Sequence, residues 1–87
     1  IRIADIDTPE VNARCGREAE LAAAATRRTR AWLLAGPFEL HRAAGRDHDR
    51  YGRKLRRVVR DGQSIGDVLV AEGLARRWQG YRRPWCN

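Results

Sequence analysis

The stretch Ile1-Arg2-Ile3-Ala4-Asp5-Ile6-Asp7-Thr8-Pro9-Glu10 opens the chain and predicts a strand that ends in a rigid acidic turn. The three isoleucines favour an extended backbone, and Pro9 fixes its own φ angle while disfavouring helix at Thr8. Asp7 and Glu10 are therefore presented on a stiff turn, which can hold carboxylates as accurately as site chemistry requires. The alternative is a strand that ends in a solvated acidic turn, since Asp and Pro are common turn residues.

A second stretch, Asp49-Arg50-Tyr51-Gly52-Arg53, precedes a strand-like segment at 54–60. In this second stretch, Arg53 lies where a glycine-containing loop leads into a strand. The acidic turn of the first stretch lies where a strand ends. We expect the two ends to face one site.

Both stretches, with Arg2 five residues before Asp7 and with a later Gly73-Leu74-Ala75, resemble the staphylococcal nuclease (thermonuclease) family. The signatures of that family look like R-x-x-x-x-D-T-P-E and D-x-Y-G-R, and the resemblance runs from Ile1 to about Trp78. It implies a mainly β fold with helices, a small OB-fold-like β-barrel, which would be N-terminally incomplete here because the family's first two strands have no counterpart. The family's second calcium-binding aspartate lies in that missing part.

The resemblance also implies a role for each matching residue. Asp7 matches the calcium-binding aspartate, and Thr8 matches the residue whose backbone carbonyl binds the metal. Glu10 matches the glutamate that activates or orients the attacking water, and Arg2 and Arg53 match the two catalytic arginines. Arg50 and Tyr51 align with positions that contact substrate phosphate.

The chemistry of these residue types agrees with that assignment. Arginine stays protonated and offers a planar fork of donors that fits phosphate oxygens. Oxygen ligands such as Asp7 and the Thr8 carbonyl select a hard ion, Ca²⁺ or Mg²⁺, but two ligands are too few for a tight site. Without the ion, we expect the arginines Arg2 and Arg53 to close onto Asp7 and Glu10.

The predicted function is that of a calcium-dependent nuclease that hydrolyses DNA and/or RNA. The alternative is a catalytically inactive nucleic-acid or protein binding module of the same fold. Arg2, Asp7, Glu10 and Arg53 are all retained, which a pure binder has no chemical reason to keep.

The basic, arginine-rich composition reflects either a polyanionic partner or a GC-rich genome. The chain of 87 residues fits one domain, 1–87, and its net charge of +7 comes from seventeen arginines and one lysine. No stretch has the length of apolar sequence that a membrane span needs. The family resemblance suggests a bacterial protein that is secreted or periplasmic.

The longest predicted helix runs from Arg17 to Ala35 and is stopped by Gly36-Pro37, with Trp32 as a core anchor. A strand at 38–42 alternates so that Phe38 and Leu40 point inward. A further strand spans 55–59, Asp49 braces the turn before it, and a short helix is capped by Ser64 and ended by Gly73.

Residues 79–87 form a basic, aromatic tail, with Tyr81, Arg82, Arg83 and Trp85. These side chains either stack on bases and hold phosphates or pack on the domain itself. Cys15 and Cys86 either form a disulfide, which would suit an oxidising compartment, or are two unrelated thiols. The exposed edge of the opening strand invites pairing with a second copy of the chain.

Overall fold

The computed structural model describes residues 2–81 and 83–86; Ile1 of the predicted opening strand and Arg82 and Asn87 of the predicted tail lie outside them. The elements in chain order are β1 (Arg2–Ile3), β2 (Ile6–Asp7), α1 (Gly16–Leu34), β3 (Glu39–Arg42), β4 (Leu55–Arg60), β5 (Gln63–Ser64), α2 (Ile65–Ala71) and β6 (Arg76–Arg77).

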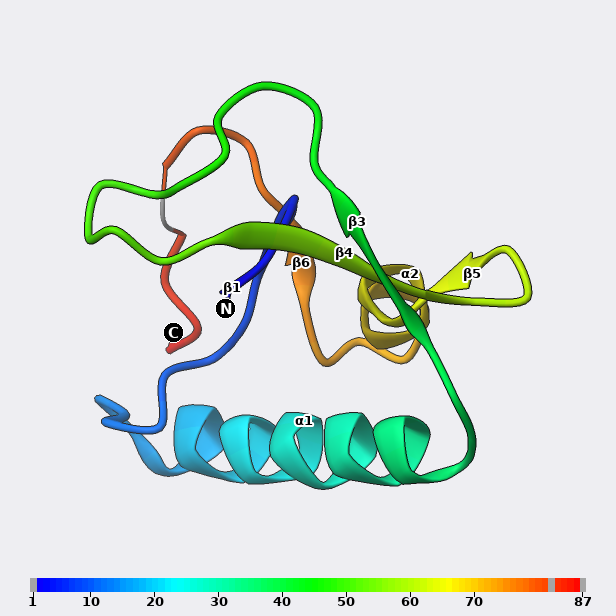
Figure 1. Cartoon of the computed structure of the whole chain (residues 1–87). Helices are drawn as coiled ribbons and strands as arrows, with labels where there is room; N and C mark the ends of the chain where they lie inside the picture. Colours follow the sequence, from blue (N-terminus) through cyan, green and yellow to red (C-terminus); the bar gives the residue numbers. More distant parts are fainter. Residues whose placement is uncertain (1, 82, 87) are drawn as a thin grey trace.

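The strands form two small sheets above helix α1 (Figure 1). In the first, β4 lies between β1, which is parallel to it, and β3, which is antiparallel, and β5 also pairs with β4. The second consists of β2 and β6 in antiparallel pairing. Among the described residues no strand pairing joins the two sheets into a closed barrel, so the structure has a small mixed sheet, a two-stranded sheet and two helices, and the OB-fold-like barrel stays a prediction.

The opening strand differs from the prediction because a turn at Ala4–Asp5 divides it. Asp5 has φ 69°, in the left-handed region, which aspartate tolerates better than most residues. Its carbonyl accepts a hydrogen bond from the Trp78 N–H at 2.9 Å. The turn lets Arg2–Ile3 pair with β4 and Ile6–Asp7 pair with β6, so one stretch of sequence supplies both sheets.

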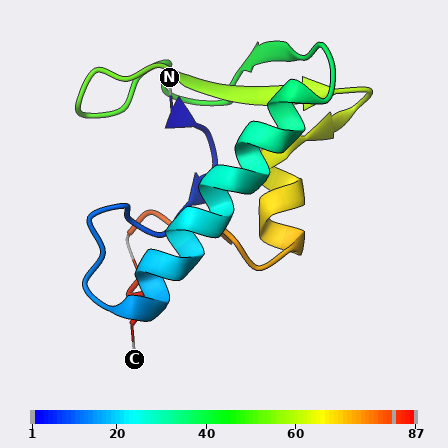
Figure 2. The same ribbon diagram turned by 90° about the horizontal axis from the view of Figure 1, so that it is seen from below.

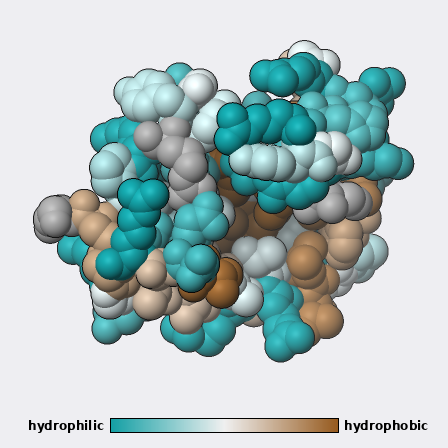
Figure 3. Space-filling model, turned by 90° about the vertical axis from the view of Figure 1, so that its left-hand side faces the viewer, coloured by the Kyte–Doolittle hydropathy of each residue, from teal (hydrophilic) through white to brown (hydrophobic). Residues whose placement is uncertain are grey.

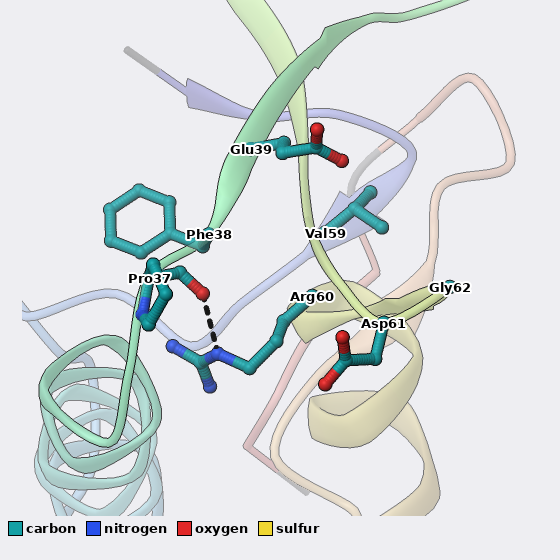
Figure 4. A pocket seen from close by; sticks show the side chains of 7 residues that line it. All are labelled: Pro37, Phe38, Glu39, Val59, Arg60, Asp61 and Gly62. Carbon is teal, nitrogen blue, oxygen red and sulfur yellow. Dashed lines mark hydrogen bonds between the residues drawn. The ribbon is translucent and has the colours of Figure 1, made fainter.

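Helix α1 is confirmed to within one residue at each end. The Cys15 side chain accepts from the Glu18 N–H at the N-cap, and Gly36-Pro37 follow the last turn. Trp32 is buried in the core, as predicted, and the Arg60 guanidinium lies 4.1 Å from the centre of its ring. Arg60 also donates to the Pro37 carbonyl at 2.8 Å (Figure 4) and to the Gly36 carbonyl. These bonds fix the chain as it leaves the helix.

The core lies between α1, α2 and the first sheet, and it consists of Ile6, Trp32, Val58, Ile65, Val68, Leu69 and Ala75. Ser64 caps α2 by accepting from the Asp67 N–H at 3.1 Å, and Gly73 follows that helix with φ 75°, both as predicted. No described helix combines the length and the apolar character needed to cross a membrane.

The prediction that Phe38 and Leu40 are buried in the core is wrong, because their exposed fractions are 42% and 49%. Leu40 pairs with Val58 and therefore faces the same side of the sheet as that core residue. However, β3 is an edge strand, and α2 packs against β4 and β5. Pairing with a second copy through the free edge of β1 stays a prediction.

Candidate active site

The acidic turn follows β2 directly. Asp7 is 3% exposed, Pro9 beside it is also buried, and Glu10 is exposed. Asp7 lies opposite Arg76 in the pairing of β2 with β6, which fixes its backbone. The turn thus combines a buried carboxylate, a half-buried Thr8 and a solvent-facing carboxylate within four residues.

Arg2 connects the acidic turn to the arginine-containing loop. Its backbone N–H donates to the Lys54 carbonyl at 2.8 Å, which places it beside the residue that follows Arg53. Its guanidinium donates to the Ile6 carbonyl at 3.2 Å, next to Asp7. A single residue of β1 therefore contacts the chain neighbours of Asp7 and of Arg53.

The loop before β4 is organised by Asp49, as predicted. One carboxylate oxygen accepts from the N–H groups of Tyr51 and Arg53, both at 2.9 Å, and the other accepts from the Arg53 Nε at 2.7 Å. Partial desolvation would raise the pKa of Asp49, but these hydrogen bonds from Arg53 and Tyr51 outweigh it and hold the pKa below its usual value. Asp49 therefore remains ionised and fixes the position of Arg53.

Arg50 and Tyr51 form an exposed group at the tip of this loop. The Arg50 guanidinium donates to the Tyr51 hydroxyl at 2.7 Å and lies 4.9 Å from its ring centre, and Arg53 lies 5.5 Å from the same ring. Tyr51 is 69% exposed. Two cations and a phenol on one exposed surface can contact a phosphate from several directions.

The structure places the acidic turn and the arginine-containing loop on the same side of the molecule, at the left in both Figure 1 and Figure 2. Figure 3 views that side and shows a central hollow with a hydrophobic floor and a mainly hydrophilic rim. Arg53 was expected to close onto Asp7 and Glu10, but its guanidinium pairs with Asp49. Asp49 is the nearer partner, since it belongs to the same loop. For Arg2 the same expectation stays a prediction.

Glu18 is a site residue that sequence reasoning missed. It lies in the first turn of α1, is 4% exposed, and accepts from the N–H groups of Glu10 at 3.2 Å and Arg14 at 2.9 Å. The spacing Cys15-x-x-Glu18 is that of a capping box, in which a glutamate reaches back to backbone N–H groups. Cysteine is not a usual N-cap residue, so this spacing is a weak signal in the sequence.

The end of the described tail, at Trp85 and Cys86, packs on the domain. Cys15 and Cys86 form a disulfide, which decides between the two alternatives for these residues. Trp85 is 8% exposed, and the Arg76 guanidinium lies 3.8 Å from its ring centre and donates to the Pro84 carbonyl at 2.8 Å. Trp85 is therefore a packing residue, whereas stacking by the 61% exposed Tyr81 stays a prediction.

A cavity of about 650 Å³ lies between the acidic turn and the tail. It is lined by Glu10, Asn12, Arg14, Glu18, Arg83, Pro84, Trp85 and Cys86. A second cavity of about 370 Å³, at residues 37–39 and 59–62, contains none of the predicted site residues (Figure 4). The first cavity therefore belongs to the candidate site, and the second does not.

The predicted metal ligands are oxygen atoms, which suit a hard metal ion, but they are too few to fill its coordination shell. Asp7 provides a buried carboxylate and Thr8 a backbone carbonyl, and oxygen ligands of this type suit Ca²⁺. Within the described ranges, His, Cys, Asp and Glu form no group of three that could hold a metal ion. Asp7 and Thr8 would therefore supply only a part of the six to eight oxygens that Ca²⁺ takes.

Comparison with known proteins agrees with this geometry. Residues 1–86 match the family described as "Staphylococcal nuclease homologue". Two Bacillus subtilis (strain 168) proteins are similar over 76 residues, or 87% of this chain: the SPbeta prophage-derived endonuclease YokF at 34% identity and the endonuclease YncB at 33%. The chain covers 26% of the former and 36% of the latter.

Proposed function

Because this chain belongs to the family of staphylococcal nuclease homologues, we propose that it is the catalytic domain of a calcium-dependent nuclease that hydrolyses phosphodiester bonds of DNA and/or RNA. The observation that carries the proposal is the position of Arg2, whose N–H donates to the carbonyl of Lys54, the residue after Arg53, while its guanidinium donates to the carbonyl of Ile6, the residue before Asp7. These two contacts support a common phosphate site between the acidic turn and the arginine-containing loop.

Each group has a distinct task in the proposed reaction. The attacking water would be held and oriented by Glu10, whose side chain is on the exposed end of the turn. Negative charge grows on the phosphate oxygens in the transition state, and the guanidinium groups of Arg2 and Arg53 would donate to those oxygens. The Arg53 hydrogen bond to Asp49 uses Nε, and a guanidinium has further N–H donors on its two Nη atoms.

The metal would be held by Asp7 and Thr8, and Ca²⁺ bound there would neutralise charge on the substrate phosphate. We include in the proposal that cleavage depends on Ca²⁺. Arg50 and Tyr51 would contact a neighbouring phosphate of the substrate, since they form an exposed cationic group on the same loop as Arg53. The net charge of +7 favours a polyanionic substrate.

The test is cleavage of single-stranded and double-stranded DNA and of RNA by the full-length protein with Ca²⁺ and with chelator. We expect cleavage that chelator abolishes, and an Arg53→Ala variant prepared in parallel controls for contaminating nuclease. Cleavage that continues undiminished in chelator would reject the metal-dependent mechanism. Binding without cleavage under every condition would favour the inactive binding module.

The disulfide supports a proposal about location. Disulfides form and persist in oxidising compartments and are rare in the reducing cytosol. We therefore propose that the protein works outside the cytoplasm, in a secreted or periplasmic setting, with the Cys15–Cys86 bond intact.

A further inference from the structure

Glu18 combines deep burial with hydrogen bonds to the loop that carries Glu10. Its carboxylate is 4% exposed and accepts from the Glu10 N–H at 3.2 Å and the Arg14 N–H at 2.9 Å. Burying a carboxylate is costly unless hydrogen bonds compensate it, and breaking them would leave a buried charge poorly satisfied. The position of the Glu10 backbone is therefore tied to the position of the Glu18 side chain.

The other end of this connection is rigid. Glu18 lies in the first turn of α1, where the helix dipole favours a negative charge, and its own N–H donates to the Cys15 sulfur at 3.4 Å. The same helix is anchored in the protein by buried Ala22, Ala25 and Trp32. The loop between Pro9 and Cys15 is thus held from a helix that is anchored in the core.

Most residues of the loop between Pro9 and Cys15 are exposed to solvent. Val11 is 84% exposed, and Glu10, Asn12 and Arg14 are also exposed. A loop with such exposed side chains depends on its backbone hydrogen bonds for order. Glu18 supplies two of these bonds, one at each end of the segment from Glu10 to Arg14.

We propose that Glu18 is the positioning residue for Glu10, holding the proposed water-orienting carboxylate in place from the first turn of α1. The effect of Glu18 on catalysis rests on the proposed function, whereas its effect on the loop does not. A displacement of about 1 Å at a reacting group can lower a rate by about a hundredfold. Removing the Glu18 contact should therefore reduce kcat while leaving KM nearly unchanged, because Arg2, Arg50 and Arg53 still bind the substrate.

The kinetic experiment compares Glu18→Gln with a matched control, Glu20→Gln, in the full-length protein. Both lose one negative charge from the same helix, but Glu20 is exposed. The glutamine amide has one acceptor oxygen where the carboxylate has two, so it cannot serve both N–H groups equally. We expect kcat to fall by about tenfold or more for Glu18→Gln and less than twofold for Glu20→Gln.

A double-mutant cycle with Glu10→Gln separates positioning from a general loss of structure. If Glu18 acts through Glu10, adding Glu18→Gln to Glu10→Gln should change kcat by less than about twofold. An equal fall in both backgrounds would overturn the proposal. Should Glu18→Gln not fold, Glu18→Asp keeps the charge, shortens the reach, and is used in the same cycle.

Amide hydrogen exchange gives a readout that does not depend on catalysis. In Glu18→Gln, exchange at the N–H groups of Glu10 and Arg14 should speed up by about tenfold or more, whereas the amides of α2 should keep their rates. Unchanged exchange at both loop amides would refute the positioning role. Equal cleavage by wild type and Glu10→Gln would instead refute the proposed role of Glu10, so the two failures are distinguishable.

Discussion

Loss of the Cys15–Cys86 disulfide should strongly destabilise this domain. The bond joins residues 71 apart, and closing a loop of that length stabilises a protein by about 4 kcal/mol in the chain-entropy model. A domain of this size has a total unfolding free energy of about 4 to 13 kcal/mol. The double variant Cys15→Ser/Cys86→Ser should therefore melt at least about 15 °C below the oxidised wild type.

The assay is thermal unfolding followed by circular dichroism, with and without reductant. Serine is a good N-cap residue, so Cys15→Ser preserves the cap of α1 and the loss reports the cross-link. Reductant should lower the Tm of the wild type toward that of the double variant and leave the double variant unchanged. A difference below about 5 °C between the oxidised wild type and the double variant would show that the cross-link adds little, and the loop-closure argument would then be wrong.

Two further predictions concern the aspartates. Asp49→Asn should lower kcat/KM by about tenfold, because the amide places a donor against the Arg53 guanidinium; exposed Asp61→Asn is the matched control and should leave steady-state cleavage unchanged. Asp49 and Asp67 both have lowered pKa values, Asp67 chiefly through its hydrogen bond from Arg77. Their contribution to stability should be complete above about pH 4 and be lost as the pH falls through those lowered values, and a urea titration at several pH values that showed rising stability below pH 4 would contradict this.

Local signals predicted the helices well. The end of α1 follows from Gly36-Pro37, and the limits of α2 follow from Ser64 and Gly73. These signals act over a few residues, so they do not depend on what the helix later packs against.

Pairing of the strands was harder to predict because it depends on distant partners. Nothing within the first ten residues indicates that Arg2–Ile3 pairs with β4 and Ile6–Asp7 with β6, since those partners lie about fifty to seventy residues away. The alternation at Phe38 and Leu40 gave the facing side of Leu40 correctly, but it could not indicate that the strand is at an edge.

In the candidate site too, local sequence signals were easier to interpret than contacts between distant residues. The family motifs predicted Arg2, Asp7, Glu10 and Arg53 as site residues, whereas the side chains that hold the surrounding loops had to be read from hydrogen bonds. Asp49 was predicted because it precedes its partner within one loop, but the hold of Glu18 on Glu10 spans eight residues and a change from loop to helix. The spacing of Glu18 from Cys15 is the local signal for this contact, and it does not indicate that the carboxylate is buried or which N–H groups it accepts from.

The turn at Ala4–Asp5 connects the two sheets, and the candidate site takes residues from both of them. Asp7 belongs to the sheet of β2 and β6, and Arg53 precedes β4 of the other sheet. A phosphate that contacted both would therefore tie the sheets together at a point where the chain provides a short covalent connection. Substrate would then act as a structural part of the domain, and the bound form would resist shear between the sheets more strongly than the free form.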